Sequence, residues 1–350
     1  MIKKTIVSVV GTRPEFIKLA AIAPHLAKHF NHQIINTGQH YDNLMANNFF
    51  KELKIAKPNW NLSIGSSSSA LQTANIIKKC AVALSKINPS FTLVYGDTNS
   101  TLGGAVAAVK SNMLVGHIEA GMRSYDKTMP EEVNRIICDH ISSILFCSSK
   151  YSVECLKKEG VNNNVFLTGD INYDIFKKTK IETEIPTTLQ IKPKGFYLLT
   201  IHRQENTLSL KRLEKLLTIL TKLKKTVIFP MHPKTGRLLV NVKIGHNIKL
   251  LKPLPFSQTL TLIKMAKAVL TDSGGIQKEA YWLKTPCITL RSTTEWQETV
   301  NSKWNHLVKC NEKLILKHSM NPHIPKKHQH LYGDGHASEK IVKILLKFLV

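Results

Sequence analysis

Short apolar segments with the character of β-strands alternate with amphipathic helical segments along nearly all of the chain. The segments Thr5–Val10, Phe91–Tyr95 and Ile144–Cys147 are hydrophobic at most positions. In residues 14–30, by contrast, apolar side chains recur at the spacing of a helix. Mostly apolar strands separated by helices are typical of a parallel sheet that is covered on both faces. The pattern therefore predicts an α/β fold.

A polar segment at residues 177–194 divides the pattern into two sets. Strands of the first set are expected at residues 5–10, 33–37, 91–95, 114–118, 144–147 and 165–167. Strands of the second set are expected at residues 196–201, 226–230, 248–250, 268–271 and 286–290. Because 350 residues exceed one compact core, we predict two doubly wound domains. Two such domains that face each other place a ligand cleft at the carboxyl ends of both sheets.

Composition excludes several classes of protein. No apolar run reaches the length of a membrane span, and the apolar start of the chain is interpreted as a strand rather than a signal peptide. The six cysteines form no Cys-x-x-Cys pair, which favours a reduced, cytoplasmic setting. The net charge of +25 raises the alternative of a nucleic-acid or membrane-surface binder. We favour a lysine-rich solvated surface, because the lysines are scattered and no nucleic-acid-binding motif is present.

Two cations follow the first predicted strand. Gly11 ends that strand, Pro14 begins a helix, and Arg13 and Lys18 lie at the helix start and one turn later. Free backbone N–H groups beside two cations suit a phosphate or a carboxylate. The alternative is an ordinary strand-to-helix turn with solvated basic residues.

Carboxylates gather at three later points of the first set. Asp97 follows a strand, and Glu119 lies between glycines at the end of the next strand, where it and His117 are expected to point to the same side. Glu131 begins a helix and lies one turn before Arg135. Taken singly, Asp97 is also explained as a turn residue and Glu131 as half of a surface ion pair. No set of His, Asp and Glu here has zinc-ligand spacing.

The second set carries a histidine and a glycine pair at its strand ends. His202 closes one strand, and Ser273, Gly274 and Gly275 lie between a strand and a helix. Small residues at a helix start let a phosphate approach the backbone N–H groups. Glu279, one turn later, is placed to accept hydrogen bonds from ribose hydroxyls.

Taken together and in order, these motifs resemble the non-hydrolysing UDP-N-acetylglucosamine 2-epimerases from Gly11 to about Gly335. The motifs that carry the resemblance are Gly-Thr-Arg-Pro-Glu-x-x-Lys, Gly-Asp-Thr, His-Ile-Glu-Ala-Gly-x-Arg, Pro-Glu-Glu-x-Asn-Arg, His-Arg-x-Glu-Asn and Asp-Ser-Gly-Gly-Ile-Gln-x-Glu.

The resemblance implies a GT-B-like fold of two Rossmann-like domains with a cleft between them. Residues 1–175 would carry the catalytic carboxylates and be completed by the C-terminal helix 337–350, and residues 176–336 would bind UDP. The family works without an added redox cofactor or metal, on a UDP-sugar, as a cytoplasmic homodimer that serves cell-surface polysaccharide synthesis. Neither nucleic acid nor membrane is implied as a partner.

The resemblance also implies roles for individual residues. The catalytic residues would be Asp97, Glu119, Glu131 and His202. The residues that bind the substrate would be Arg13, Lys18, Arg135, His232, Phe256, Ser273, Gly274, Gly275 and Glu279. Chemistry agrees with this assignment, because inversion at C2 needs carboxylates with differently tuned pKa values and the leaving diphosphate needs cations and N–H dipoles. Which carboxylate is the acid and which is the base stays open.

Some segments depart from the best-known members of the family. Trp296 replaces an arginine that contacts nucleotide, and residues 66–69 replace a segment that carries an arginine in substrate-activated members. The Glu295-Trp296 pair and residues 95–101 and 200–203 resemble the branch that acts on UDP-2,3-diacetamido-2,3-dideoxyglucuronic acid. In that branch Arg123 or Lys127 would meet the sugar carboxylate. Further alternatives are a hydrolysing epimerase, a GT-B glycosyltransferase and, last, a basic nucleic-acid-binding protein.

Overall fold

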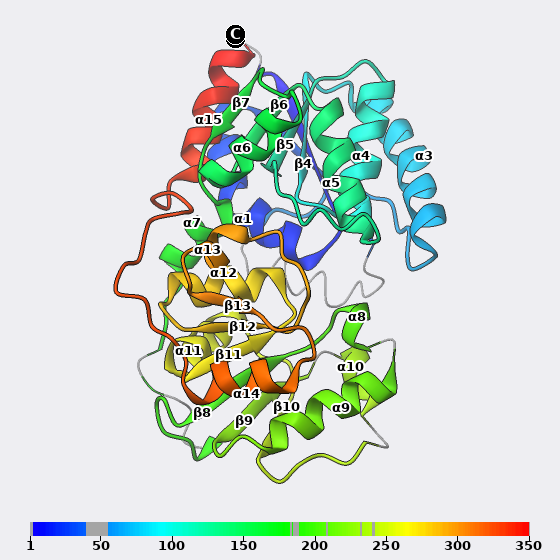
Figure 1. The fold of residues 1–350 in the computed structure, drawn as a ribbon. Helices are drawn as coiled ribbons and strands as arrows, with labels where there is room; N and C mark the ends of the chain where they lie inside the picture. Colours follow the sequence, from blue (N-terminus) through cyan, green and yellow to red (C-terminus); the bar gives the residue numbers. More distant parts are fainter. Residues whose placement is uncertain are drawn as a thin grey trace. The chain divides into compact units, whose positions relative to one another are not determined.

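The computed structural model describes residues 3–39, 55–182, 184, 189–207, 209–231, 233–239 and 242–349. The chain divides into two compact units. Unit 1 comprises Met1–Lys178 and His330–Val350, and unit 2 comprises Thr179–Gln329. Figure 1 shows the helices and strands of both. No helix in the described part of the chain is both long and apolar enough to cross a membrane.

The described residues of unit 1 form a seven-stranded sheet in the order β3-β2-β1-β4-β5-β6-β7. All of its strand pairs are parallel. The strands are β1 (Thr5–Val10), β2 (Asn31–Asn36), β3 (Trp60–Asn61), β4 (Phe91–Tyr95), β5 (Val115–Ala120), β6 (Ile144–Cys147) and β7 (Val165–Leu167). The order reverses between β1 and β4, which makes this point the topological switch of a Rossmann-like sheet.

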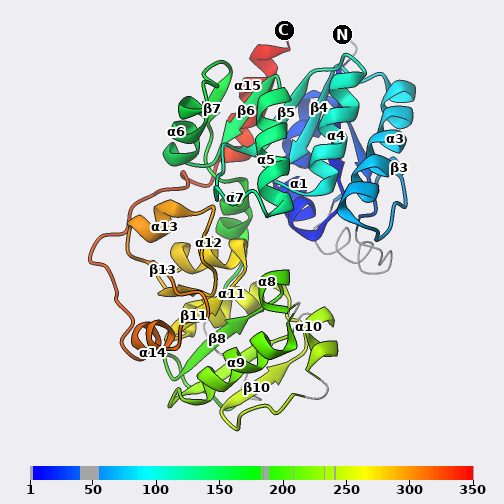
Figure 2. The same ribbon diagram turned by 45° about the vertical axis from the view of Figure 1, so that its right-hand side comes forward.

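Helices cover both faces of this sheet because each buried strand is apolar on both sides. Ile6 and Val10 of β1 pack on one face with α1 (Arg13–His29), α7 (Ile171–Lys178) and α15 (Ala337–Phe348). Val7 and Val9 pack on the other face, with α3 (Ser69–Ile87), α4 (Asn99–Lys110) and α5 (Pro130–Ile141). Figure 2 shows α15, from the end of the chain, within this unit, and α15 contacts α1 and α7. The remaining described helix is α6 (Lys150–Lys158).

The described residues of unit 2 form a six-stranded sheet in the order β10-β9-β8-β11-β12-β13, again with parallel pairs. Its strands are β8 (Phe196–Thr200), β9 (Thr226–Pro230), β10 (Ile248–Leu251), β11 (Ala268–Thr271), β12 (Cys287–Thr289) and β13 (Asn305–Leu307). Its helices are α8 (Gln204–Thr207), α9 (Leu210–Thr221), α10 (Pro233–Leu238), α11 (Phe256–Met265), α12 (Gly274–Trp282), α13 (Gln297–Asn301) and α14 (Glu312–Met320). The switch point lies between β8 and β11.

The predicted α/β class with two Rossmann-like sheets is confirmed. Six predicted strands, β1, β4, β6, β7, β9 and β11, have the expected bounds, and the other predicted strands differ at their ends by one or two residues. The sequence interpretation missed β3 and β13, which are two and three residues long. Elements this short carry too few side chains for a periodic pattern.

Candidate active site

The switch point of unit 1 brings the first two motifs of the sequence together. Gly11 and Arg13 follow β1, while Asp97 follows the neighbouring strand β4. Helix α1 begins at Arg13, so Pro14 is its second residue rather than its first. Ligands of such sheets bind in the crevice at the carboxyl ends of the strands, beside the switch point.

A buried carboxylate that sequence reasoning missed holds this turn. Glu15 is fully buried and accepts hydrogen bonds from the backbone N–H groups of Gly11 and Thr12, at 2.7 and 2.8 Å. The hydroxyl of Thr98, which begins α4, also donates to Glu15. Glu15 thus ties the end of β1 to the end of β4. The signal was present in the sequence, because Thr12-x-x-Glu15 is a capping box.

Glu119 lies next to Lys18, and its backbone is unusual. The Lys18 Nζ and Glu119 Oε1 atoms are 2.8 Å apart, and both side chains are largely buried. Asn172 of α7 donates to the other carboxylate oxygen at 3.3 Å. Glu119 has φ +71°, and the β5–β6 register shifts between Ile118 and Ala120.

This bulge makes one prediction wrong. His117 and Glu119 do not point to the same side, because the left-handed residue breaks the alternation of side chains along β5. His117 contacts Asp139 of α5, whereas Glu119 contacts α1 and α7. The sequence showed the two-residue spacing but not the extra residue in the strand.

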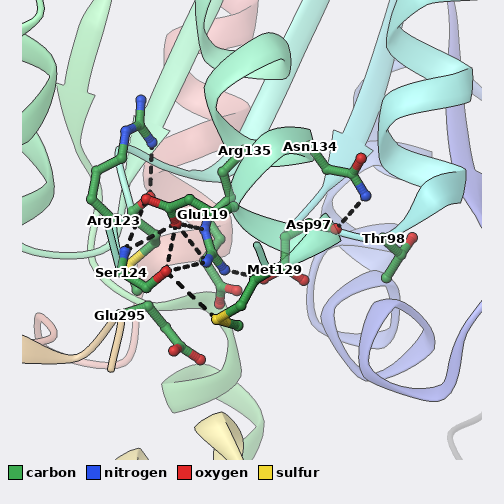
Figure 3. A network of polar contacts seen from close by, with 12 residues as sticks. Asp97, Thr98, Glu119, Arg123, Ser124, Met129, Asn134, Arg135 and Glu295 are labelled. Atoms are coloured by element: carbon green, nitrogen blue, oxygen red, sulfur yellow. Dashed lines mark hydrogen bonds and ion pairs between the residues drawn. The ribbon is translucent and has the colours of Figure 1, made fainter. Parts of the chain in front are cut away.

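Asp97 is held from helix α5. The Arg135 guanidinium forms an ion pair with the Asp97 carboxylate, and Asn134 Nδ2 donates to the Asp97 carbonyl at 2.9 Å (Figure 3). Burial raises the pKa of Asp97, and the negative charges of Glu131 and Glu119 act in the same direction, while Arg135 and Lys18 lower it. Glu119 and Glu131 therefore both lie near enough to Asp97 to raise its pKa.

Arg135 is buried rather than exposed on the surface, and its guanidinium contacts Glu132. Its Nη2 atom lies 2.7 Å from Glu132 Oε2, and its Nε atom donates to the same oxygen at 3.0 Å. Glu132 is fully buried and accepts from the backbone N–H groups of Ser124 and Tyr125. Glu132 was missed because either residue of the Glu131-Glu132 doublet suits a first helical turn.

The suggestion that Arg123 meets a sugar carboxylate is wrong, because other carboxylates already bind its guanidinium. Its Nε and Nη2 atoms each donate to Glu159 at 2.7 Å, and Nη1 donates to Asp139 at 2.6 Å. The side chain has no exposed surface. Lys127, the other candidate, is exposed.

In unit 2, a buried carboxylate shapes the switch point between β8 and β11. Asp272 follows β11 and accepts from the backbone N–H groups of His202 and Arg203, at 3.1 Å each. Asn206 Nδ2 donates to the same carboxylate at 3.0 Å. The His202 Nδ1 atom is 3.4 Å from Asp272, while 42% of the His202 side-chain surface is exposed. His202 is thus anchored at its backbone, and its ring is accessible.

The Ser-Gly-Gly turn begins helix α12, with Ser273 as its cap in an extended conformation. A side chain at Gly274 would collide with the Glu295 carboxylate and lie 3.1 Å from Trp296 Nε1. At Gly275 a side chain would meet only Glu279 and Ser273, at ordinary contact distances of 3.8 and 3.9 Å. Gly274 is therefore required by packing, whereas the Gly275 side of the turn is open.

Beneath this turn lies a cluster of buried charges. Arg291 forms an ion pair of 2.9 Å with Glu295, whose other oxygen is 3.6 Å from Arg203. Lys278 Nζ is 3.9 Å from the ring centre of Trp296, which is itself buried. Sequence reasoning gave Arg291 and Lys278 no role.

Two further predicted site residues lie at helix starts, and a third lies outside the described part of the chain. Arg13, at the start of α1, and Phe256, at the start of α11, are half-buried. His232 lies outside the described residues. Among the described residues, no three His, Cys, Asp or Glu side chains form a group that could hold a metal ion.

The chain was compared with known proteins. The family profile for UDP-N-acetylglucosamine 2-epimerase matches residues 24–346. A UDP-N-acetylglucosamine 2-epimerase homologue of Methanococcus maripaludis is 44% identical over 97% of this chain and 99% of that protein. The UDP-2,3-diacetamido-2,3-dideoxy-D-glucuronate 2-epimerase of Pseudomonas aeruginosa is 35% identical over 98% of this chain and 99% of that protein.

Solved structures agree. The crystal structure of Methanocaldococcus jannaschii UDP-GlcNAc 2-epimerase in complex with UDP-GlcNAc and UDP has a TM-score of 0.89 and 36% identity, covering 98% of this chain and 99% of that one. The calicheamicin glycosyltransferase CalG4, at 10% identity and a TM-score of 0.62, covers 100% of this chain and 99% of that one and shares the fold alone. The family resemblance expected from the motifs is confirmed, and this chain belongs to the UDP-N-acetylglucosamine 2-epimerase family of enzymes.

Proposed function

We propose that this protein epimerises C2 of a UDP-N-acetylated amino sugar, converting UDP-N-acetylglucosamine to UDP-N-acetylmannosamine without net hydrolysis. Removal of the C2 proton and elimination of UDP leave a glycal. UDP then returns to C1, and a proton is added to C2 on the face opposite to the one it left. The product serves as a precursor of cell-surface polysaccharide. The enzyme acts in the cytoplasm as a homodimer.

The observation that carries the proposal is the set of carboxylates at the carboxyl end of the unit 1 sheet. Glu119 and Glu131 both raise the pKa of Asp97, yet the surroundings of Asp97 and Glu119 differ. Glu119 forms an ion pair with Lys18, whereas burial raises the pKa of Asp97. Removing a proton from C2 and returning one to the other face requires carboxyl groups with different proton affinities.

The UDP leaving group needs stabilisation of its negative charge, and we assign this role to unit 2. The N-terminus of α12, with Ser273, Gly274 and Gly275, offers backbone N–H groups to the diphosphate. The exposed ring of His202 assists departure of UDP, and Glu279 binds the ribose. Among the other proposed contacts, Arg13, Lys18, Arg135 and His232 bind the anionic substrate, and Phe256 lies beside uracil.

This assignment gives each domain a main task. Residues 1–175 with the C-terminal helix 337–350 supply the proton-transfer groups, and residues 176–336 hold UDP. No metal or redox cofactor is assigned a part in the reaction.

Incubation with UDP-N-acetylglucosamine in deuterated water tests the proposal. The expected product is UDP-N-acetylmannosamine with deuterium at C2, observed by NMR. Release of free N-acetylmannosamine and UDP as the main products would replace the proposal with a hydrolysing epimerase. If no UDP-sugar exchanges its C2 proton with solvent, the proposal is contradicted.

UDP-2,3-diacetamido-2,3-dideoxyglucuronate is the second candidate substrate, because the Pseudomonas aeruginosa enzyme named for it is 35% identical to this chain. The structure supports the neutral sugar, since the Arg123 guanidinium already binds Glu159 and Asp139. Parallel assays of the two UDP-sugars decide between them. A higher kcat/KM for the acidic sugar would overturn the neutral assignment.

A further inference from the structure

His117 lies at the centre of a buried network beneath Asp97. The His117 ring has no exposed surface. Its Nδ1 atom is 2.7 Å from Asp139 Oδ1, and its Nε2 atom is 2.7 Å from the Gly96 carbonyl oxygen. A carbonyl oxygen only accepts hydrogen bonds, so Nε2 must carry a proton. Whether Nδ1 also carries one depends on the charge of Asp139.

The contacts of Asp139 identify it as an ionised carboxylate. Its Oδ2 atom accepts from Arg123 Nη1 at 2.6 Å and from the Gly121 N–H at 3.0 Å. An ionised carboxylate accepts only, so Nδ1 must also be a donor.

The charges in the network favour a cationic ring. Arg123 is shared between Asp139, which has no exposed side-chain surface, and Glu159, which is partly exposed and also contacts His140. The Cys138 and Cys147 thiols beside Asp139 stay neutral, because burial raises the pKa of each. A buried negative charge without a partner costs several kcal/mol. A protonated His117 supplies the missing positive charge.

The Nε2 contact holds the residue that immediately precedes Asp97. Gly96 has φ +71°, its N–H donates to the Ile118 carbonyl at 2.9 Å, and its own carbonyl accepts from His117. Asn134 holds the next carbonyl, that of Asp97. The carbonyl groups on both sides of the Asp97 Cα atom are therefore held, one by β5 and the other by α5.

We propose that both ring nitrogens of His117 donate hydrogen bonds, to Asp139 and to the Gly96 carbonyl, and that this doubly protonated ring positions Asp97 through the Gly96 carbonyl. His117 acts as a positioning residue, since it reaches Asp97 only through the backbone. The positioning half of the proposal rests on the proposed epimerase function, whereas the protonation half does not.

NMR of protein labelled with ¹⁵N at its histidine rings tests the protonation half without any assay of activity. His117 is expected to show two protonated, imidazolium-type nitrogens at neutral pH. His32 is an internal reference, because it is partly buried in the same unit and burial lowers its pKa to about 4. Variants at each position assign the two signals. A bare, unprotonated His117 nitrogen at neutral pH would overturn the proposal.

Two substitutions test the positioning half. The Asn side chain in His117→Asn can still donate to Asp139 but cannot reach the Gly96 carbonyl, whereas the longer Gln side chain in His117→Gln can reach that carbonyl. A displaced catalytic group costs about 100-fold in rate. We therefore expect His117→Asn to lower kcat about 100-fold with little change in KM, and His117→Gln to lose several-fold less.

The control variant is His32→Gln, which changes a partly buried histidine whose ring bonds to Ser8 of β1 at 2.8 Å. It is expected to retain the wild-type kcat. Equal losses in kcat for the Asn and Gln variants at position 117, or a wild-type kcat for both, would overturn the positioning role. If wild-type protein turns over no UDP-sugar, the proposed function fails, while the NMR result still decides the charge of His117.

Discussion

The two switch points of the molecule have the same topology and different chemistry. In both units the central strands follow the order 3-2-1-4-5-6. Unit 1 places charged side chains at this point, with Glu119 paired to Lys18 and Asp97 to Arg135. Unit 2 turns its carboxylate inward, since Asp272 is buried and binds backbone N–H groups. The fold supplies the location, and the residues at the strand ends decide the chemistry.

This difference leads us to separate proton transfer from nucleotide binding. Side-chain carboxylates can exchange protons with a substrate, and backbone N–H groups at a helix start can bind an anion but cannot take up a proton. Substitutions in the two regions should therefore change different kinetic quantities.

The largest effect is expected from the carboxylates of unit 1. Asp97→Asn, Glu119→Gln and Glu131→Gln each remove a group that we assign to proton transfer. Each should lower kcat by about 10²- to 10⁴-fold. The affinity for UDP, measured by calorimetry, should stay within a few-fold of the wild type. Wild-type turnover in all three variants would break the division between the two regions.

A substitution in unit 2 should act on UDP binding. Gly274→Ala pushes a methyl group against Glu295 and Trp296, which costs about 1–3 kcal/mol in a packed site and displaces the start of α12. We expect the affinity for UDP to fall about 10-fold or more. Gly275→Ala is the matched control, because its side chain meets only ordinary contacts. Equal affinities for UDP in the two variants would contradict the close packing described for Gly274.

Asp272→Asn tests the inward-turned carboxylate. The amide keeps the size of the side chain but loses the charge that accepts from the His202 and Arg203 N–H groups. Hydrogen bonds to a charged group contribute about 1.5–3 kcal/mol, so kcat/KM should fall about 10-fold or more as the His202 turn loosens. Steady-state kinetics would show this, and an unchanged kcat/KM would show that Asp272 does not hold His202 for the reaction.

The smallest expected effect concerns stability rather than catalysis. Burial lowers the pKa of His32 to about 4 from its ordinary value of 6.5. The neutral ring therefore contributes its full stability above about pH 6.5, and this contribution is lost as the pH falls towards 4. Between about pH 7.5 and pH 5, the free energy of unfolding should fall by about 2 kcal/mol more in the wild type than in His32→Gln. Urea denaturation at both pH values measures this difference, and parallel losses would contradict it.

Sequence reasoning found the strand ends more reliably than the partners of the side chains there. Continuous apolar runs such as Phe91–Tyr95 mark a buried parallel strand, so the positions that follow them were placed correctly. The bulge at Glu119 could not be predicted, because one extra residue in a strand leaves no compositional mark.

The carboxylates that pair with buried arginines were harder to predict than those that follow the strands. Glu132 and Asp139 look in sequence like ordinary helix residues, and only the fold brings Arg135 to the former and Arg123 to the latter. The suggestion that Arg123 meets a sugar carboxylate was wrong for the same reason. Contacts between distant segments decide which charges stay available, and no local pattern encodes them.

The central claim is that UDP leaves the sugar and returns to it while carboxylates of unit 1 exchange the proton at C2. Positional isotope exchange tests this most directly, with UDP-N-acetylglucosamine carrying ¹⁸O in the bridge between C1 and the β-phosphorus. Elimination and return of UDP should move the label into non-bridging positions of the β-phosphate while C2 exchanges its proton with solvent. Exchange at C2 with the label still entirely in the bridge would contradict the account.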